Sequence, residues 1–128
     1  TKGDCALCHN GANFADDDFH NIGTGTDSDR GRYEIEKDEY YLGAFKTPAL
    51  RNWKLREPFM HDGRFRTIRE VIHFYVNPGP TKIGKREIDP IPLTAEEVED
   101  LVAFLEVLNG DWPDLAPYQA AWNRLVAQ

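Results

Sequence analysis

The sequence is short of cysteine, methionine and long apolar runs. Its two cysteines, Cys5 and Cys8, stand close together, so no cysteine is left for a disulfide between distant segments. A structural zinc site needs four Cys or His ligands at close spacing, and no second pair of this kind follows. No apolar stretch approaches the ~18 residues of a membrane span. Met60 is the single methionine and therefore the one possible thioether ligand.

Positive charge is scarce as well. The chain has 15 Lys and Arg against 22 Asp and Glu, which gives a net charge of −7. A nucleic-acid-binding protein presents a basic face, so this function is not expected. A charged partner is instead expected to present Lys or Arg. The acidic triplet 16–18 is interpreted as a solvated face; a calcium site is the alternative, although no EF-hand spacing follows it.

What the sequence does contain is a C-x-x-C-H run, Cys5-Ala6-Leu7-Cys8-His9. Its spacing places two thiols one helical turn apart, where they can add to the two vinyl groups of a haem, and His9 can then bind the iron. The alternatives are a disulfide, a redox C-x-x-C or half of a zinc site. A redox motif would sit in a βαβ pattern, which the sequence does not show. We therefore expect one covalent haem c, and hence a periplasmic or other extracytoplasmic location.

Apolar periodicity predicts a mainly α fold, because no segment alternates in the manner of a strand. Thr94 and Glu97 form a capping box before one helix, and Asn109-Gly110 is expected to end it. The expected helices span residues 67–75, 94–109 and 117–126.

The remaining segments are expected to be long loops. Residues 10–46 are polar and Gly-rich, and residues 76–92 hold four prolines. The fold class predicted is therefore a cytochrome c-like haem domain with long loops, formed by residues 1–128 as a single domain. Four residues precede Cys5, too few for the helix that small c-type domains place there. We therefore expect this domain to be a piece of a longer protein.

Three strings carry a family resemblance. They are Phe-His-Asn-Ile-Gly at 19–23, Phe-Lys-Thr-Pro-Ala-Leu-Arg-Asn at 45–52, and Pro-Phe-Met-His-Asp-Gly-Arg-Phe at 58–65. From about Gly3 to Gly110 the chain resembles the C-terminal haem domain of the bacterial di-haem cytochrome c peroxidases and their MauG-like relatives. The resemblance implies a partner domain, N-terminal to this one, whose haem cleaves hydrogen peroxide.

In that family the C-terminal haem is six-coordinate and transfers electrons or stores an oxidising equivalent. The resemblance therefore implies a peroxidase-type oxidoreductase as the full protein. The alternative is a stand-alone mono-haem cytochrome c that carries electrons. The oxidised substrate and the electron donor are not specified by either interpretation.

Two residues compete to be the second iron ligand opposite His9. Chemistry alone favours Met60, because His/Met ligation is usual in electron-transfer cytochromes. The resemblance favours Tyr75, which stands seventeen residues after Pro58, where the peroxidases carry their methionine ligand and MauG-like proteins carry tyrosine. A phenolate stabilises oxidised iron and lowers the potential, which suits a haem that stores an oxidising equivalent. The expected pair is His9 and Tyr75.

Further roles are expected around the haem. Arg51 is a candidate partner for a haem propionate, because its planar fork matches two carboxylate oxygens; a surface ion pair is the alternative. Lys46 and Arg64 are further candidates for the same contact. By the family resemblance, the backbone carbonyls of Arg56 and Pro58 are implied as ligands of a calcium ion at the domain interface.

For the other three histidines and for Trp53, we favour a structural role over a role at the haem. His20 is expected to pack, with tuning of the haem potential as the alternative. His61 precedes a turn signal and is expected to hydrogen-bond across that turn or to a propionate. His73 is expected to be exposed. Trp53 is expected to pack in the core, with an electron-hopping role as the alternative.

Overall fold

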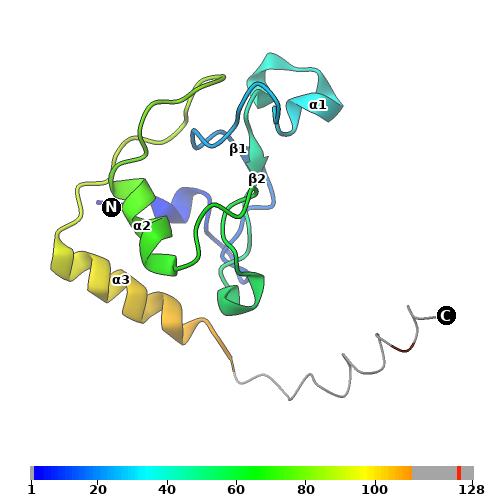
Figure 1. Cartoon of the computed structure of the whole chain (residues 1–128). Coiled ribbons are helices and arrows are strands. Elements are labelled where there is room, and N and C mark those ends of the chain that lie inside the picture. Colours follow the sequence, from blue (N-terminus) through cyan, green and yellow to red (C-terminus); the bar gives the residue numbers. More distant parts are fainter. Residues whose placement is uncertain (1, 111–123, 125–128) are drawn as a thin grey trace.

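The computed structural model describes residues 2–110 and 124. Figure 1 shows α2 and α3 side by side, with the small sheet and α1 farther along the molecule. The expected helix 117–126 falls outside the described residues, apart from residue 124. Of the helices described, none is long and apolar enough to cross a bilayer. The elements in chain order are η1 (Cys5–Leu7), β1 (Phe19–His20), α1 (Tyr33–Glu36), η2 (Glu39–Tyr41), β2 (Phe45–Lys46), η3 (Trp53–Arg56), α2 (Ile68–Val76) and α3 (Ala95–Val107).

The two longer helices start from the same local signal. The hydroxyl of Thr94 accepts a hydrogen bond from the Glu97 amide at 3.2 Å, and the Glu97 carboxylate accepts one from the Thr94 amide at 2.7 Å. Thr67 and Glu70 form the same reciprocal box at the start of α2. Each cap of this kind stabilises a helix by ~0.5–2 kcal/mol. The helices predicted at 67–75 and 94–109 are both confirmed, with small differences at their ends.

The end of α3 differs from the prediction. The helix stops at Val107, and Gly110 does not take the left-handed conformation expected of a glycine cap. The terminus is held instead by Asn52, whose amide donates to the Leu108 carbonyl at 3.0 Å and whose side-chain oxygen accepts from the Gly110 amide at 2.9 Å. A residue far away in the sequence therefore satisfies backbone groups that a local cap usually satisfies.

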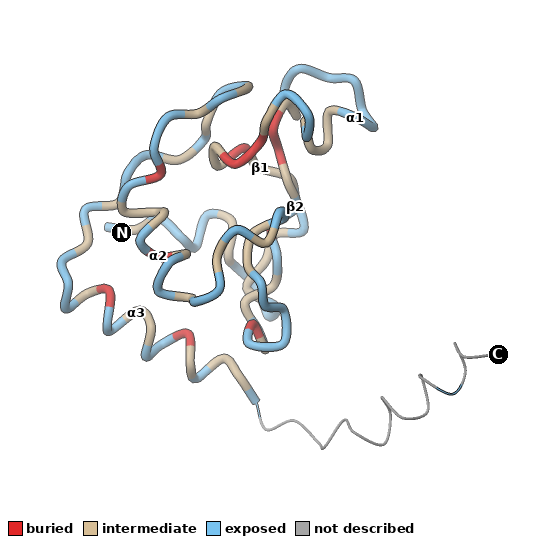
Figure 2. The backbone as a smooth tube through the Cα atoms, viewed as in Figure 1, coloured by how far each residue is buried: buried red, intermediate tan, exposed pale blue. Residues whose placement is uncertain are grey.

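The core lies between η3, α2 and α3. Trp53 is 6% exposed and packs with Ile72, Val98 and Leu105, which are also buried. Its indole N–H donates to the Leu105 carbonyl at 2.8 Å, so the polar atom of the ring is satisfied inside the core. Figure 2 shows the buried positions of α3 recurring along the helix. The core-packing interpretation of Trp53 is confirmed.

Three glutamates of α3 form ion pairs with cations from three different segments. Glu97 pairs with Lys2 at 2.7 Å, Glu99 with Arg69 of α2 at 2.9 Å, and Glu106 with Lys54 of η3. All three pairs are exposed, and exposed ion pairs contribute ~0–1 kcal/mol each.

The expectation that no strand forms is wrong. β1 and β2 pair antiparallel, with Phe19 opposite Lys46 and His20 opposite Phe45. Each strand has two residues, too few to produce an alternating pattern that a sequence could reveal. Around this pair, residues 10–46 are loops and single turns as predicted, and residues 77–94 contain no helix or strand. The architecture fits a cytochrome c-like domain with long loops.

A buried amide, that of Asn21, connects three of these loops. The side chain is 1% exposed; its nitrogen donates to the carbonyls of Leu42 at 2.7 Å and Ile83 at 3.0 Å. Its oxygen accepts from the Gly23 amide at 2.8 Å. At Gly43 and Gly84 an added Cβ would lie 2.8 and 2.7 Å from the Asn21 nitrogen, so side chains are excluded there.

Replacing Asn21 with alanine should therefore destabilise the protein by about 3 kcal/mol, because two part-buried carbonyls lose their donor. Chemical unfolding of the haem-loaded protein measures this loss. Asn13→Ala, at an exposed position, is the matched control and should change stability by less than about 0.5 kcal/mol. Equal stabilities of the two variants would contradict the role given to the Asn21 amide.

Candidate haem site

The C-x-x-C-H run forms one tight turn. Cys5–Leu7 is a 3-10 helix, and the His9 amide donates to the Cys5 carbonyl at 2.8 Å, which closes the motif on itself. Both thiols are free. The turn is therefore shaped to present two cysteines and a histidine to one neighbouring group.

His9 is held in one tautomer. Its Nδ1 lies 2.9 Å from the carbonyl oxygen of Phe14. A carbonyl only accepts, so the proton is assigned to Nδ1, and Nε2 is left with a free lone pair. Metal-binding histidines are oriented in this way by a carbonyl or carboxylate behind the ring. The geometry suits His9 for iron ligation.

An apolar cavity adjoins the motif. Its volume is about 180 Å³, and Cys5 and the Tyr75 ring line it together with aliphatic side chains. The space holds one edge of a porphyrin rather than the whole macrocycle. The Tyr75 carbonyl accepts from the Ile91 amide at 2.9 Å, so the loop after α2 closes over the cavity. The other lining residues are Gly3, Ile72, Ile91, Leu93 and Leu101.

Tyr75 and Met60 differ in position. Removal of the Tyr75 phenol from water raises its pKa to about 12, with the thiols of Cys5 and Cys8 adding to the effect. Met60 does not line the cavity. Its backbone is left-handed, with φ 67°, and it begins a turn that is closed by a hydrogen bond from the Gly63 amide to the Met60 carbonyl. The structure therefore brings Cys5 and Tyr75 together and leaves Met60 apart.

The thiols do not resemble those of a redox motif. Burial raises the pKa of Cys5, and burial together with Asp16 and Glu87 raises the pKa of Cys8. Cysteines that exchange disulfides have lowered pKa values, because the thiolate is the reactive form. The electrostatics of the motif do not favour the redox alternative.

One further feature fits a haem at this motif. Leu7 is 73% exposed between the two cysteines, an apolar surface that a porphyrin edge would cover.

The other candidates occupy the surrounding loops. The Arg51 Nε donates to the Ala12 carbonyl, and its guanidinium lies 5.5 Å from the Phe14 ring, so it supports the loop behind His9. Arg56 uses its side chain to hold the Arg51 carbonyl at 3.0 Å. Arg56 and Pro58 are both exposed, on either side of Glu57.

Of the two contacts expected of His61, the bond across its own turn is not formed, and the contact with a propionate stays a prediction. The His61 Nε2 lies 3.3 Å from the Asp29 carboxylate, and its ring stacks on that of Phe45 with the ring centroids 3.4 Å apart and the planes inclined by 9°. Burial of the ring lowers its pKa. His73 is exposed on α2, as predicted.

No protein-family model matches the chain. Individual relatives do. The chain is 37% identical over 113 residues to the methylamine utilization protein MauG of Methylorubrum extorquens, covering 86% of the chain and 32% of the relative. It is 34% identical over 140 residues to the cytochrome-c peroxidase IdrP1 of Denitromonas iodatirespirans, covering 84% and 37%. A crystal structure of a MauG-like protein associated with microbial copper homeostasis superposes with a TM-score of 0.72 at 30% identity, covering 86% of this chain and 41% of that one.

The chain belongs to the di-haem peroxidase and MauG family. Its relatives are named as cytochrome-c peroxidases and MauG proteins, so the family is one of haem-dependent oxidoreductases. The chain spans about a third of the length of the curated relatives it matches.

A histidine clamp beside Cys8 was not predicted for this peroxidase-family domain. His20 lies between Asp16, at 2.9 Å from its Nε2, and Glu87, at 2.8 Å from its Nδ1. The Cys8 sulfur lies within 4.8 Å of the Asp16 and His20 ligand atoms. The family string at 19–23 marks His20, but Glu87 stands 67 residues away and the sequence gives no signal that joins them.

The contacts within the clamp shift the pKa values of His20 and Asp16. Burial alone would lower the pKa of His20, but hydrogen bonds to Glu87 and Asp16 outweigh it, and the pKa rises above its ordinary 6.5. Burial alone would raise the pKa of Asp16, but bonds from the Asp18 amide, His20 and Thr47 lower it to about 2. The clamp therefore favours the imidazolium form of His20 between two carboxylates.

The raised pKa of His20 predicts a pH-dependent stability. The stabilisation is complete below the unfolded-state pKa of about 6.5 and is lost as pH rises through the folded-state value. The free energy of unfolding should therefore fall as pH rises above 6.5, and His20→Gln should abolish that slope. His73→Gln, on the exposed face of α2, should retain it. An unchanged slope in His20→Gln would show that the clamp carries no linked proton.

Proposed function

We propose that the chain is the C-terminal haem domain of a di-haem peroxidase or MauG-like oxidoreductase. Its haem would be six-coordinate, with His9 and Tyr75 as axial ligands, and would transfer electrons or store an oxidising equivalent. One observation carries the proposal: Tyr75 shares a cavity with Cys5 of the motif whose His9 has its Nδ1 bonded to the Phe14 carbonyl.

Haem c attached through Cys5 and Cys8 would supply one-electron redox chemistry. The chain itself orients the ligands: the Phe14 carbonyl fixes the His9 ring, and the loop carrying Ile91 closes the cavity around Tyr75. The aliphatic lining excludes water from the phenol. A pKa of about 12 keeps free Tyr75 protonated at neutral pH, so ligation would displace its proton, as metal binding does in general.

The peroxide-cleaving step is assigned to an N-terminal haem domain, which would be the partner of this one. Such chemistry needs an open iron position with an acid-base group above it. The cavity beside the motif is lined instead by Cys5, Gly3, aliphatic side chains and the Tyr75 phenol, which is proposed as an iron ligand. A calcium ion held partly by the carbonyls of Arg56 and Pro58 belongs to the same proposed domain interface.

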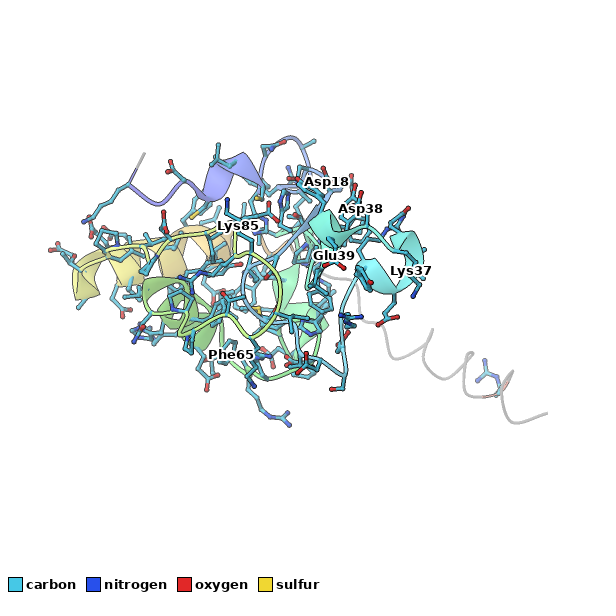
Figure 3. All side chains as sticks on the ribbon, turned by 90° about the horizontal axis from the view of Figure 1, so that it is seen from above. Asp18, Lys37, Asp38, Glu39, Phe65 and Lys85 are labelled. Carbon is cyan, nitrogen blue, oxygen red and sulfur yellow. The ribbon has the colours of Figure 1, made fainter. Side chains whose placement is uncertain are left out.

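The electron donor or protein substrate is proposed to present a basic surface. The chain carries a net charge of −7. Figure 3 shows Asp18, Asp38 and Glu39 toward one end of the molecule, with Lys37 beside them. Complementary charge speeds association with a basic partner. Because covalent haem attachment takes place outside the cytoplasm, we propose a periplasmic location.

A stand-alone mono-haem electron carrier is the second candidate, and the free cysteines, His9 and the apolar cavity fit it as well. The complete coding sequence discriminates between the two. A second C-x-x-C-H domain encoded upstream supports the di-haem oxidoreductase, whereas a secretion signal followed by one helix supports the carrier.

Covalent attachment is the first test. The protein produced with haem-maturation machinery should keep its haem after denaturation and acid extraction, with a mass increased by one haem for this domain. Cys5→Ser with Cys8→Ser should release the haem under the same treatment, because both thioether bonds are then absent. A domain of unchanged mass, or one loaded with zinc, would refute the haem assignment.

The second test concerns the identity of the second axial ligand. Tyr75→Phe should change the absorption spectrum and raise the potential of this haem by on the order of 100 mV, within the ~0.8 V that axial ligands span, because an anionic oxygen donor is lost. Met60→Leu is the matched control and should leave both readings unchanged. If only the Met60 change perturbs the iron, ligation by Met60 replaces the proposal for Tyr75.

A further inference from the structure

We infer that His20 binds a proton when the haem beside it is reduced and releases that proton when the haem is oxidised; the inference rests on the proposed function. Both nitrogens of the ring face a carboxylate, with Nε2 at 2.9 Å from Asp16 and Nδ1 at 2.8 Å from Glu87. A neutral imidazole has one N–H and one lone pair, so it can donate to only one of the two carboxylates. Loss of the proton would therefore leave a lone pair opposite a carboxylate.

The two carboxylates are held in place by the backbone. Asp16 accepts from the Asp18 amide at 3.0 Å, and its own amide donates to the Cys8 carbonyl at 2.8 Å. Glu87 accepts from the Asn21 amide at 2.8 Å, and its own amide donates to the Asn21 carbonyl at 2.9 Å. In Figure 1 the yellow-green loop between α2 and α3 reaches toward the chain beside β1. Because both acids are anchored, the ring can relieve their charge only by keeping its proton.

The clamp lies beside a point of haem attachment. The Cys8 sulfur lies within 4.8 Å of a carboxylate oxygen of Asp16 and a ring nitrogen of His20. In the proposed function this sulfur carries a thioether bond to the porphyrin, so the imidazole lies near the edge of the macrocycle. The His20 side chain is 20% exposed, so it exchanges protons with water but is shielded from most of it. A charge in such a position acts on the haem more strongly than a fully hydrated charge does.

Electron and proton are linked by this attraction. One electron from the donor converts ferric to ferrous iron, and one proton from the solvent binds His20; oxidation reverses both. The reduced haem carries one more negative charge, so the pKa of His20 is higher beside reduced than beside oxidised haem. Between these two pKa values the equilibrium constant for reduction falls by up to tenfold per pH unit, or about 59 mV for a one-electron couple.

The position of this interval follows from the clamp. Burial lowers the pKa of His20, but the hydrogen bonds to Glu87 and Asp16 outweigh burial and raise it above its ordinary 6.5. The redox-linked step is therefore expected above pH 6.5.

The other charged groups near the clamp have contacts of their own. Lys46, on the strand paired with β1, forms an ion pair with Asp17. Arg86, next to Glu87, donates to two backbone carbonyls at 2.6 and 2.8 Å. Asp18 accepts from the following amide at 2.8 Å. Carboxylates, lysine and arginine ordinarily keep their charges between roughly pH 6 and 9, which leaves the imidazole as the titrating group of this cluster.

The measurement is the potential of this haem against pH, in the haem-loaded protein produced from its complete coding sequence. The wild-type potential should fall as pH rises through the interval. His20→Gln cannot be charged, so its potential should lie below that of wild type at low pH and meet it at high pH, where the imidazole is neutral. A loss of packing alone would displace the potential at every pH.

Glu87→Gln should move the step rather than remove it. One of the two carboxylates that favour the imidazolium becomes neutral, so the step should shift to lower pH by about one unit. This variant also serves if His20→Gln does not load with haem. His73→Gln, on the exposed face of α2, is the matched control and should leave the curve unchanged. In unbuffered solution, reduction of the wild type within the interval should take up protons that His20→Gln does not.

A step that persists in His20→Gln would overturn the inference. If His61→Gln then removes the step, the proton belongs to His61; if neither change removes it, a haem propionate is the group that titrates. A wild-type potential that stays constant between about pH 6 and 10 would also overturn the inference. These outcomes are read in protein whose mass shows covalent haem, so a failure of the proposed function itself is recognised separately.

Discussion

The side-chain amide of Asn21 is the contact on which the loop half of this protein depends. Long polar segments cannot bury enough apolar surface to hold themselves in place, so specific hydrogen bonds must order them. Asn21 reaches Leu42 and Ile83, which lie 21 and 62 residues away in the chain. It can do so because Gly43 and Gly84 leave room for the amide where a Cβ would collide. The helical half needs no such contact, since an apolar core joins α2 and α3.

The two halves differ accordingly in what a sequence can reveal. The starts of α2 and α3 depend on residues three positions apart, so the capping pattern of Thr94 and Glu97 was visible and the same pattern at Thr67 could have been used. The end of α3 could not be predicted, because Asn52 satisfies it from a distant segment. The two-residue strands β1 and β2 could not be predicted for a related reason, because their pairing depends on contacts between loops that are distant in the sequence.

The candidate site follows the same division. Cys5, Cys8 and His9 lie within one motif, and the chemistry of the motif is local, so the sequence sufficed to propose them. Tyr75 followed from family register, and the structure brings it to the same cavity as Cys5. The clamp of His20 by Asp16 and Glu87 was missed. Glu87 lies 67 residues from His20, and a linear pattern does not encode such a long-range approach.

The three ion pairs along α3 act on the position of the helix more than on its stability. Lys2, Arg69 and Lys54 come from separate parts of the chain and meet glutamates at both ends of α3. A helix moved by one turn, or reversed, would misalign all three pairs at once, although each is individually weak. Because mobile ions screen exposed charges, the attraction within these three ion pairs weakens at high ionic strength, whereas the packing of the apolar core does not. The helix is thus placed by charge and retained by packing.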